Sequence, residues 1–515
     1  MNKKLFIFYI SILSISGAIA YLINRPKEIL YEAKWNDINT LAITIDGVIS
    51  TTFPTTNAYE GTVSCTTGTG SVSWNGSKWV LTTSGITKGK TKCNIIFNKP
   101  LYKAILAKNT VKQPLTTPGT EVSAYKESDV TATSSSSVSS TYRSYYVTYG
   151  TGYEANGTEF NLTGTAVTTD TYTNSYASLV GKYLPYDRIY DSGSSTAGTK
   201  VTTTNLNYVV YVVSATSSKF TYKLIGSNKN QSEALLASTD DDYGTSYYFR
   251  GSVTNNYVKF ANKCWRIVRI GGDNTIKLIL HNDNTANVSN PCSSENNSTN
   301  AAFARYSGST YTSTFNSSND DNAYVGFMYG TPGSTTYEAT HANINKSTAL
   351  TNLEIWYNNN LKTYESVIDD NVFCNDKSVF SGLGYGTNKT SYIANKRAII
   401  KEPSLKCNGD LSRIIGKVGL ITSDETIYAG YNNIGYSYNY LQENANGSDW
   451  WTMSPAVYLD NTAGATIYKI TGSSGRHTYL KVDGSGTALR PYISLKATAN
   501  ISGGTGTSED PYVVE

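Results

Sequence analysis

The sequence predicts a multidomain, mainly β protein that is exported from the cell and ends in an α+β domain. Tyr accounts for 42 of its 515 residues and Gly for another 42. Tyr and Thr favour strands, whereas Gly, Asn and Ser favour turns. The N-terminus carries a long apolar segment that directs export. A chain of this length is expected to form roughly two to four domains.

The charge composition excludes one large class of function. The 43 Lys and Arg residues nearly balance the 39 Asp and Glu residues, so the net charge of +4 gives no reason to expect a nucleic-acid partner. Only 16% of the residues are charged, against about 25% in typical soluble domains. With only three His and three Met, the composition favours an extracellular binding or structural protein.

Residues 1–24 are predicted to export the chain. Residues 5–23 carry no charge and as a helix would be about 28 Å long, close to the hydrocarbon thickness of a bilayer. The AIA triplet at 18–20 resembles a cleavage site, so a removed signal peptide competes with a retained membrane anchor. The length of the apolar run favours the anchor, which would tether an extracellular protein to the cell membrane.

Residues 35–100 are predicted to form a small β-sandwich. Asp46-Gly47 and Asn75-Gly76 are pairs typical of tight turns between strands. Trp74 and Trp79 are interpreted as core residues rather than as a ligand platform, because two packed sheets need large apolar side chains between them.

Residues 101–140 are predicted as a short helix and a Ser/Thr-rich linker, the linker covering 113–140. Strand patterns resume in residues 141–237, which we interpret as a second β-rich domain. Its many Tyr side chains suit glycan binding, but cross-strand Tyr and Thr pairs also stabilise sheets without a ligand.

The final region, residues 238–515, is predicted to be an α+β domain. Its strand CWRIVRI at 264–270 mixes apolar and charged residues on both faces, which indicates a sheet partly covered on both sides. Further strands are expected at 247–251, 275–280, 465–470, 478–482 and 490–495.

Two helices are expected in this region. The first has an apolar and aromatic stripe at three- and four-residue steps, which is interpreted as core. Thr422 stands at the N-cap position of a second, short helix that Gly430 would end. The stripe of the first helix consists of Leu350, Leu353, Trp356, Tyr357, Leu361 and Tyr364.

The stretch SDWWTMSP at 448–455 places two indoles side by side at the start of a predicted strand. Strand alternation sends Trp450 and Trp451 to opposite faces, so they cannot form one stacking surface and at least one must be buried. Trp450 keeps ligand contact as an alternative role because it follows a polar loop.

The cysteines are expected to form disulfides because their number is even and the chain is exported. The simplest pairing is sequential, each bond closing a loop of about thirty residues and contributing roughly 3–4 kcal/mol in the chain-entropy model. Other pairings, reduced buried thiols and zinc remain alternatives, although no C-x-x-C pair supports zinc. The residues are Cys65, Cys93, Cys264, Cys292, Cys374 and Cys407.

Several motifs resemble a largely uncharacterised family of exported proteins from low-GC Gram-positive bacteria. They are KCWRIVRI at 263–270, NLEIWYNNNLKTY at 352–364, VGLITSDETIYAG at 418–430, DWWTMSP at 449–455 and ALRPYISL at 488–495. The resemblance implies a C-terminal domain similar in its order of elements to the C-type-lectin-like fold, in the branch of formylglycine-generating enzymes and retroelement variable proteins. It assigns no activity.

No catalytic constellation is recognised, and no catalytic residue is assigned. His281, His341 and His477 are expected in polar loops or turns, without a G-x-S-x-G, H-E-x-x-H or Walker A motif. The GLGYG run at 382–386 is interpreted as a Gly-rich loop because no helix follows it and the third glycine of a dinucleotide site is missing.

Calcium is a better candidate than zinc because oxygen ligands gather at 240–242 and 320–322. No EF-hand spacing supports it, so no metal ligand or cofactor is assigned. Adjacent acids, including Asp369-Asp370, are interpreted as solvated loop or helix-end charge, since a glycosidase needs two carboxylates that converge from distinct elements.

The sequence therefore predicts a non-catalytic cell-surface binding or adhesion protein, in which β modules present a lectin-like head to a glycan or protein ligand. The alternatives are a glycan-acting hydrolase and a purely structural envelope protein. Recognition is expected on the loops 431–448 and 460–466, whose composition suits adaptable contacts but also fits an ordinary surface loop. The candidate residues are Tyr431, Asn432, Tyr436, Tyr438, Tyr440, Asn444, Asn446, Trp450, Asp460 and Asn461.

Overall fold

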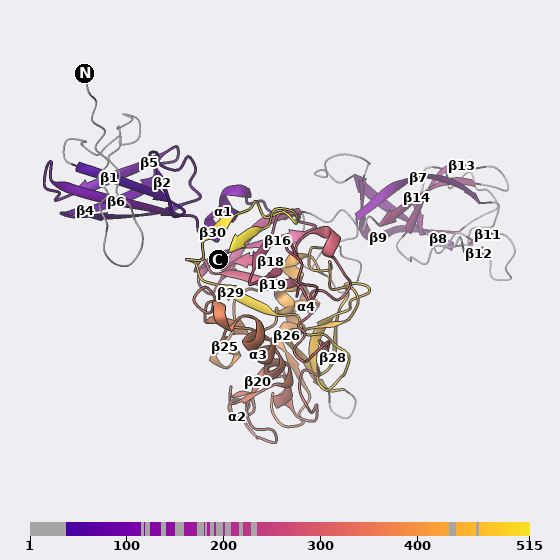
Figure 1. Cartoon of the computed structure of the whole chain (residues 1–515). Coiled ribbons are helices and arrows are strands. Elements are labelled where there is room, and N and C mark those ends of the chain that lie inside the picture. The colour runs from indigo at the N-terminus through magenta and orange to yellow at the C-terminus, as the bar shows by residue number, and fades with distance from the viewer. Residues whose placement is uncertain are drawn as a thin grey trace.

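The computed structural model describes residues 38–114, 234–431, 439–459 and 463–514, with short segments between 118 and 227. This part of the chain is mainly β, with several sheets and few helices (Figure 1). None of its helices is long and apolar enough to span a membrane. The predicted anchor or signal peptide, residues 1–24, lies outside the described residues.

The N-terminal module consists of two sheets, as predicted. Trp79 and Phe97, from different sheets, meet with ring centroids 5.0 Å apart in a shared core, and Trp74 packs against it half-buried. The turn at Asp46 and Gly47 has positive φ at both residues, which suits a tight hairpin. The first sheet contains β1 (Ile38–Ile45), β2 (Val48–Ser50), β3 (Glu60–Cys65) and β6 (Thr91–Asn98), and the second contains β4 (Thr69–Trp74) and β5 (Trp79–Ser84).

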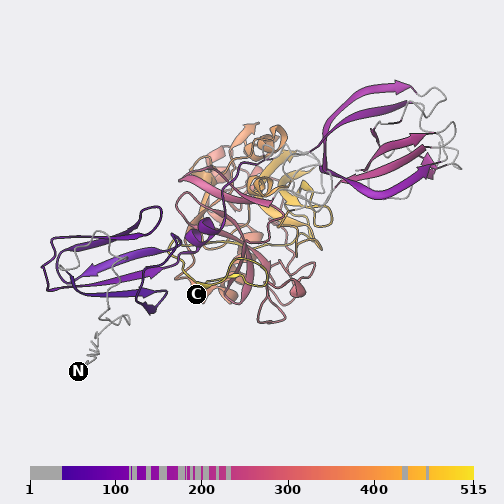
Figure 2. The ribbon, with the colours of Figure 1, turned by 90° about the horizontal axis from the view of Figure 1, so that it is seen from above.

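Helix α1 (Leu101–Lys108) forms where a short helix is predicted, but it is part of a core rather than of a linker. Leu101 and Ile105 are fully buried in the hydrophobic cluster of the final region. The backbone N–H of Leu101 donates to Ala499 O over 2.8 Å. In Figures 1 and 2 the helix lies between the N-terminal module and the final region.

The linker prediction is also wrong for β7 (Ala124–Ser134), which is a strand of a six-stranded sheet. Thr and Val in this segment favour an extended backbone, so its hydroxyl side chains indicate a strand as well as a linker. The second β-rich domain therefore begins before residue 141. Its other strands are β8 (Thr141–Tyr149), β9 (Glu159–Thr171), β10 (Tyr183–Pro185), β13 (Tyr208–Ala215) and β14 (Phe220–Ser227), beside the pair β11 (Tyr190–Asp191) and β12 (Thr199–Lys200).

The final region contains an eight-stranded sheet in which β18 (Lys263–Ile270) pairs with β16, β17 and β19. Every β18 residue except Arg269 is buried, so the sheet is covered on both sides at this strand, where partial cover is predicted. Strand β15 pairs with β16 from Ala234 onward, which moves the predicted boundary at 238 toward the N-terminus. The remaining strands are β15 (Ala234–Asp241), β16 (Gly244–Gly251), β17 (Tyr257–Phe260), β19 (Ile276–Asn282), β29 (Tyr492–Leu495), β30 (Ile501–Gly503) and β31 (Tyr512–Val514).

Smaller sheets complete this region. The pairing of β27 with β28 confirms the predicted strand pair. A five-stranded sheet contains β23 (Val379–Ser381), β24 (Thr390–Tyr392), β26 (Trp450–Leu459), β27 (Gly464–Ile470) and β28 (His477–Lys481). Two-stranded sheets are formed by β20 (Met328–Tyr329) with β21 (Asn345–Lys346), and by β22 (Asn371–Cys374) with β25 (Arg413–Gly416).

Both predicted helices are present. Helix α3 (Thr348–Asn360) buries the first part of the predicted stripe, including Leu353 and Trp356. Leu361 is buried just past the end of the helix, whereas Tyr364 is half-buried. Helix α5 (Ser423–Ala429) begins with a capping box between Thr422 and Glu425. The chain adds α2 (Tyr337–His341), α4 (Ile393–Ile400) and the 3₁₀ turns η4 (Ser294–Asn296), η5 (Asn322–Val325), η6 (Lys362–Tyr364) and η7 (Asp410–Ser412).

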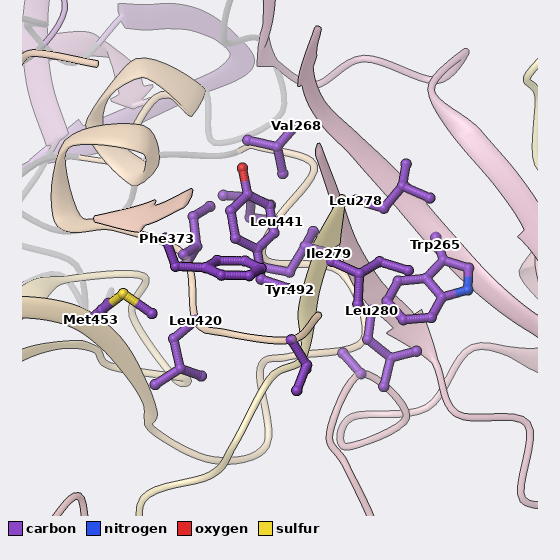
Figure 3. Close-up of a cluster of buried hydrophobic side chains, with 14 of the residues drawn as sticks. Trp265, Val268, Leu278, Ile279, Leu280, Phe373, Leu420, Leu441, Met453 and Tyr492 are labelled. Atoms are coloured by element: carbon purple, nitrogen blue, oxygen red, sulfur yellow. The ribbon is translucent and has the colours of Figure 1, made fainter. Parts of the chain in front are cut away.

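Trp450 and Trp451 are both fully buried, because β26 is covered on both faces. Trp451 Nε1 donates to Ser313 O over 2.8 Å, and the Arg490 guanidinium lies 5.1 Å from the Trp450 ring centroid. Figure 3 shows part of the same core, in which Tyr492 packs between Phe373 and the β19 side chains.

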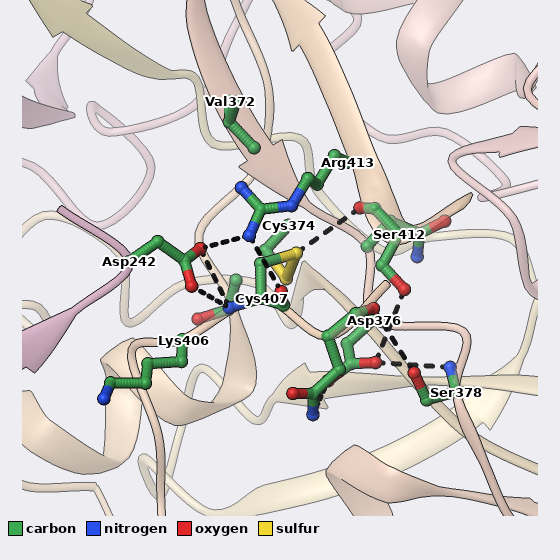
Figure 4. Close-up of a disulfide and its surroundings, with 12 residues drawn as sticks. Asp242, Val372, Cys374, Asp376, Ser378, Lys406, Cys407, Ser412 and Arg413 are labelled. Carbon is green, nitrogen blue, oxygen red and sulfur yellow. Dashed lines mark hydrogen bonds and ion pairs between the residues drawn. A yellow bond between two sulfur atoms is a disulfide. The ribbon is translucent and has the colours of Figure 1, made fainter. Parts of the chain in front are cut away.

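The sequential disulfide pairing is confirmed. Cys65 lies directly opposite Cys93 in neighbouring strands. Around the last bond, Arg413 Nη2 contacts Asp242 Oδ2 at 2.9 Å and donates to Cys407 O over 3.1 Å (Figure 4). The three bonds are Cys65–Cys93, Cys264–Cys292 and Cys374–Cys407.

Candidate ligand-binding site

A cavity of about 460 Å³ lies between segments that are far apart in the sequence. Its walls come from the turn after β16, from β17 and β18, from the loop after η4 and from the segment 439–446. Amide, hydroxyl and tyrosine side chains dominate the lining, and its volume falls within the range of small-ligand sites. The residues that the argument uses are Tyr257, Arg266, Asn297, Asn439, Tyr440 and Glu443.

Arg266 forms the rigid wall of this cavity. Its side chain is only 1% exposed, and all three guanidinium nitrogens are paired. They donate to Asn256 Oδ1 at 2.7 Å, Glu443 Oε2 at 2.8 Å and Val253 O at 2.6 Å. The guanidinium carbon lies 3.7 Å from the Tyr257 ring centroid, a cation–π contact. Because each guanidinium nitrogen has a partner, the charge is fixed in place.

Glu443 is the polar centre of the site, with a side chain that is 38% exposed. Oε2 also accepts from the Tyr257 hydroxyl at 2.7 Å, and Oε1 accepts from Asn297 Nδ2 at 2.8 Å. Burial, together with the nearby Glu443 charge, raises the pKa of Tyr257 to about 12, so Tyr257 stays a donor. A carboxylate offers about four lone-pair positions, and these bonds leave acceptor capacity facing the cavity.

Two polar groups in the wall find no hydrogen-bond partner among the described residues. They are the Tyr440 hydroxyl and Asn439 Nδ2, both buried and both part of the cavity lining. Burial raises the pKa of Tyr440 well above its ordinary value, so the hydroxyl remains a donor. Unpaired buried polar groups are rare and costly. In the described lining these two are the buried side-chain atoms that lack a partner.

A second layer supports the wall from behind. Asn444 Nδ2 lies 3.2 Å from His281 Nε2, which assigns Nε2 as an acceptor because the amide nitrogen donates. Burial and the neighbouring Arg266 and Arg490 charges hold the pKa of His281 well below its ordinary value, so the ring is neutral. Burial also lowers the pKa of Arg490, to about 10. The Arg490 guanidinium donates to Leu280 O at 2.9 Å and Leu441 O at 2.5 Å.

The structure divides the predicted ligand residues into three groups. Tyr440, Asn444 and Asn446 line the cavity, and ligand contact stays a prediction for these three. Tyr431 and Trp450 are fully buried behind it, with ring centroids 6.2 Å apart, so the prediction of direct ligand contact is wrong for these two. The other predicted residues, Asn432, Tyr436, Tyr438, Asp460 and Asn461, lie outside the described residues.

Sequence reasoning missed Arg266, Tyr257 and Glu443. Arg266 alternates with apolar residues in a strand buried on both faces, so no pattern shows which face meets a cavity. Glu443 lies within the predicted loop 431–448, and its place between amide-rich neighbours was the available signal.

The histidines are buried rather than placed in polar loops, which corrects that prediction. His281 belongs to β19 and His477 to β28. His477 Nε2 lies 2.9 Å from Ser423 Oγ, but both side chains are buried and offer no surface to a substrate. Burial lowers the pKa of His477 to about 3. This pair is part of the core.

Acidic residues of the predicted clusters make ion pairs and hydrogen bonds within the fold. Asp241 is buried and pairs with Arg269 at 2.8 Å, so its interpretation as solvated charge is wrong. Asp321 is helix-end charge as predicted, because its carboxylate accepts from Ala323 N at the start of η5. In the described part of the chain, no three His, Cys, Asp or Glu side chains are grouped to hold a metal ion.

No family model matches this chain, and neither a curated protein nor a solved structure does. The resemblance to exported Gram-positive proteins, and to the C-type-lectin-like fold, therefore stays a prediction.

Proposed function

We propose that this chain is an exported, non-catalytic cell-surface protein that binds a glycan in the cavity beside Arg266 and Glu443. The observation that carries the proposal is that the Tyr440 hydroxyl and Asn439 Nδ2 are the buried side-chain atoms without a hydrogen-bond partner in the described lining. Three disulfides suit an oxidising, extracellular compartment. The β modules then carry a lectin-like head at the cell surface.

A glycan fits this wall because each sugar hydroxyl both donates and accepts. Glu443 supplies an acceptor, while Tyr440 and Asn439 supply donors. Since the Arg266 ion pair fixes the Glu443 carboxylate before any ligand arrives, little ordering is needed on binding.

The number of carboxylates in the described lining of the cavity favours glycan binding over glycan hydrolysis. Glu443 is the one carboxylate among the described lining residues, and it is held by Arg266, Tyr257 and Asn297. Glycoside hydrolysis ordinarily needs two carboxylates on opposite sides of the scissile bond.

The substitution Tyr440→Phe tests the proposal. It removes the hydroxyl and keeps the ring, so one ligand hydrogen bond of about 0.5–1.5 kcal/mol is lost and affinity falls roughly two- to tenfold. Stability of the free protein is expected not to fall, because the removed group has no partner. Calorimetric titration of the full chain with cell-wall and mucin-type oligosaccharides measures the affinity, and thermal unfolding measures the stability.

The matched control is Tyr479→Phe, which alters a 46% exposed tyrosine on β28 and is expected to leave affinity unchanged. Absence of binding by every oligosaccharide at millimolar concentration would contradict the proposal. Equal affinity of the Tyr440→Phe variant and the unmodified protein would also contradict it.

A further inference from the structure

We infer that Lys277 and Asn371 react to form an intramolecular amide cross-link between β19 and β22. Lys277 Nζ lies 2.6 Å from Asn371 Oδ1, and the two residues are 3% and 6% exposed. They are 94 positions apart in the sequence, so only the folded chain brings them together. The site is separate from the cavity, and the inference stands independently of the proposed function.

Lys277 has the surroundings of a nucleophilic amine. Its Nζ contacts Asn371 Oδ1 and, at 3.3 Å, Val372 O, and it lies 5.0 Å from the Phe373 ring centroid. No carboxylate among the described residues lies within ion-pair distance of it. Burial and the Arg269 charge lower its pKa to about 7, although Glu425, Asp273 and Asp369 act in the opposite direction. A large neutral fraction at neutral pH makes the amine reactive.

The Asn371 side chain presents its amide oxygen to the lysine and its amide nitrogen to a carboxylate and two hydroxyls. Its oxygen faces the lysine, while three acceptors surround the two N–H groups of Nδ2, which lies 3.2 Å from Asp369 Oδ2, 3.1 Å from Thr275 Oγ1 and 3.1 Å from Ser494 Oγ. The nitrogen that must leave therefore contacts a carboxylate that can deliver a proton.

The reaction balances without an added reagent. The neutral Nζ attacks Asn371 Cγ, the Nζ–Cγ bond forms and the Cγ–Nδ2 bond breaks. Once Nζ is bonded to Cγ it lies next to Nδ2, so Asp369, which contacts Nδ2, takes the proton that Nζ releases and passes it to Nδ2, which departs as ammonia. Holding both groups in one site replaces a bimolecular encounter with an intramolecular step, an advantage that reaches several powers of ten. The product joins the eight-stranded sheet to the two-stranded sheet that carries Cys374.

A second buried Lys–Asn pair provides an internal comparison. Lys377 Nζ lies 2.7 Å from Asn343 Oδ1, and burial lowers its pKa to about 7. It also donates to Met328 O at 2.9 Å and His341 O at 2.8 Å, which satisfies all three donors of an ammonium. The Asn343 amide nitrogen, which would have to leave, donates to the backbone Arg413 O rather than to a carboxylate. The Lys377 ammonium thus has three acceptors, and no acidic side chain contacts the Asn343 nitrogen in the described part of the chain. We expect no cross-link there.

Mass spectrometry of the reduced, alkylated and trypsin-digested full chain tests the inference. The expected product is a branched peptide that contains Lys277 and Asn371, is uncleaved after Lys277, and is lighter than its two parts by one ammonia. Succinimide formation at an Asn-Gly pair loses the same mass but leaves a linear peptide. Recovery of the two peptides separately, with cleavage after Lys277, would overturn the inference.

Variants separate the roles of the three side chains. Lys277→Met is expected to abolish the branched peptide, and Lys377→Met to leave it unchanged. Asp369→Asn is expected to slow its formation by about a hundredfold or more, the usual contribution of a positioned acid–base group. An unchanged rate in Asp369→Asn overturns the relay. If Lys277→Met does not fold, the digestion of the unmodified chain still decides the question.

Discussion

Arg266 links the core of the final region to its cavity. Removing a charged group from water is costly unless it is paired and hydrogen-bonded, and here the guanidinium has four contacts that offset that cost. Its ion-pair partner Glu443 remains partly exposed. A ligand that binds Glu443 therefore acts directly on a charge pair that is anchored inside the sheet.

At the same scale, Trp451 is expected to be essential for stability. The side chain is fully buried, donates to Ser313 O and meets the Phe315 ring with centroids 5.8 Å apart. We predict that Trp451→Ala lowers the free energy of unfolding by roughly 3–5 kcal/mol, as for other large core aromatics. Denaturant unfolding followed by circular dichroism checks this. Trp74→Ala, at a half-buried site of the N-terminal module, should cost less, and an unchanged midpoint in Trp451→Ala would refute the prediction.

Individual elements differ in how far the sequence determines them. Helix α5 is predictable because its local signals agree: Thr422 caps it, Glu425 completes the capping box and Gly430 ends it at φ 116°. Helix α4 has no side-chain cap at Tyr392 and exposes the apolar Ile399 and Ile400. Its sequence therefore lacks both the cap and the amphipathic period that a prediction needs.

The candidate site likewise contains residues that local sequence composition predicts and residues that it does not. The segment before β26 could be selected by composition, and three of its predicted residues do line the cavity. Arg266 and Tyr257 come from strands whose two faces look alike in sequence, so only the packing of the sheet decides which face meets the cavity. The disulfides were predictable because sequential pairing closes the shortest loops.

Two substitutions separate the contributions that the N-cap of α5 and the Glu425–Arg269 ion pair make to the free energy of unfolding. Thr422→Ala removes the side chain that accepts from Glu425 N and should lower the free energy of unfolding by about 1 kcal/mol. Glu425→Ala should cost about 3–5 kcal/mol, because Glu425 also accepts from Arg269 Nε at 2.8 Å and from the Tyr492 hydroxyl at 2.8 Å. Denaturant titration compares the two, and equal losses would mean that the buried pair contributes nothing beyond the cap.

At the scale of the whole molecule, the N-terminal module is attached through the core of the final region rather than by a free linker. The Ile501 N–H donates to Lys99 O over 3.0 Å, which extends the contact made by α1. Figure 2 shows the six-stranded sheet on the opposite side of the final region from this module. Each module can be predicted from the strand pattern of its own residues. The sequence of a short apolar helix, however, does not indicate against which distant core the helix packs.

The placement of α1 predicts which part of the molecule an α1 substitution destabilises. Ile105 is fully buried in the core of the final region, so Ile105→Ala should cost about 2–5 kcal/mol there through lost apolar contact and the cavity left behind. Hydrogen exchange monitored by mass spectrometry should then rise in β15 and β30, while β1 and β6 keep their protection because their core is separate. Lys108→Ala, at an exposed position of the same helix, is the matched control. Faster exchange confined to the N-terminal module would show that α1 belongs to that module instead.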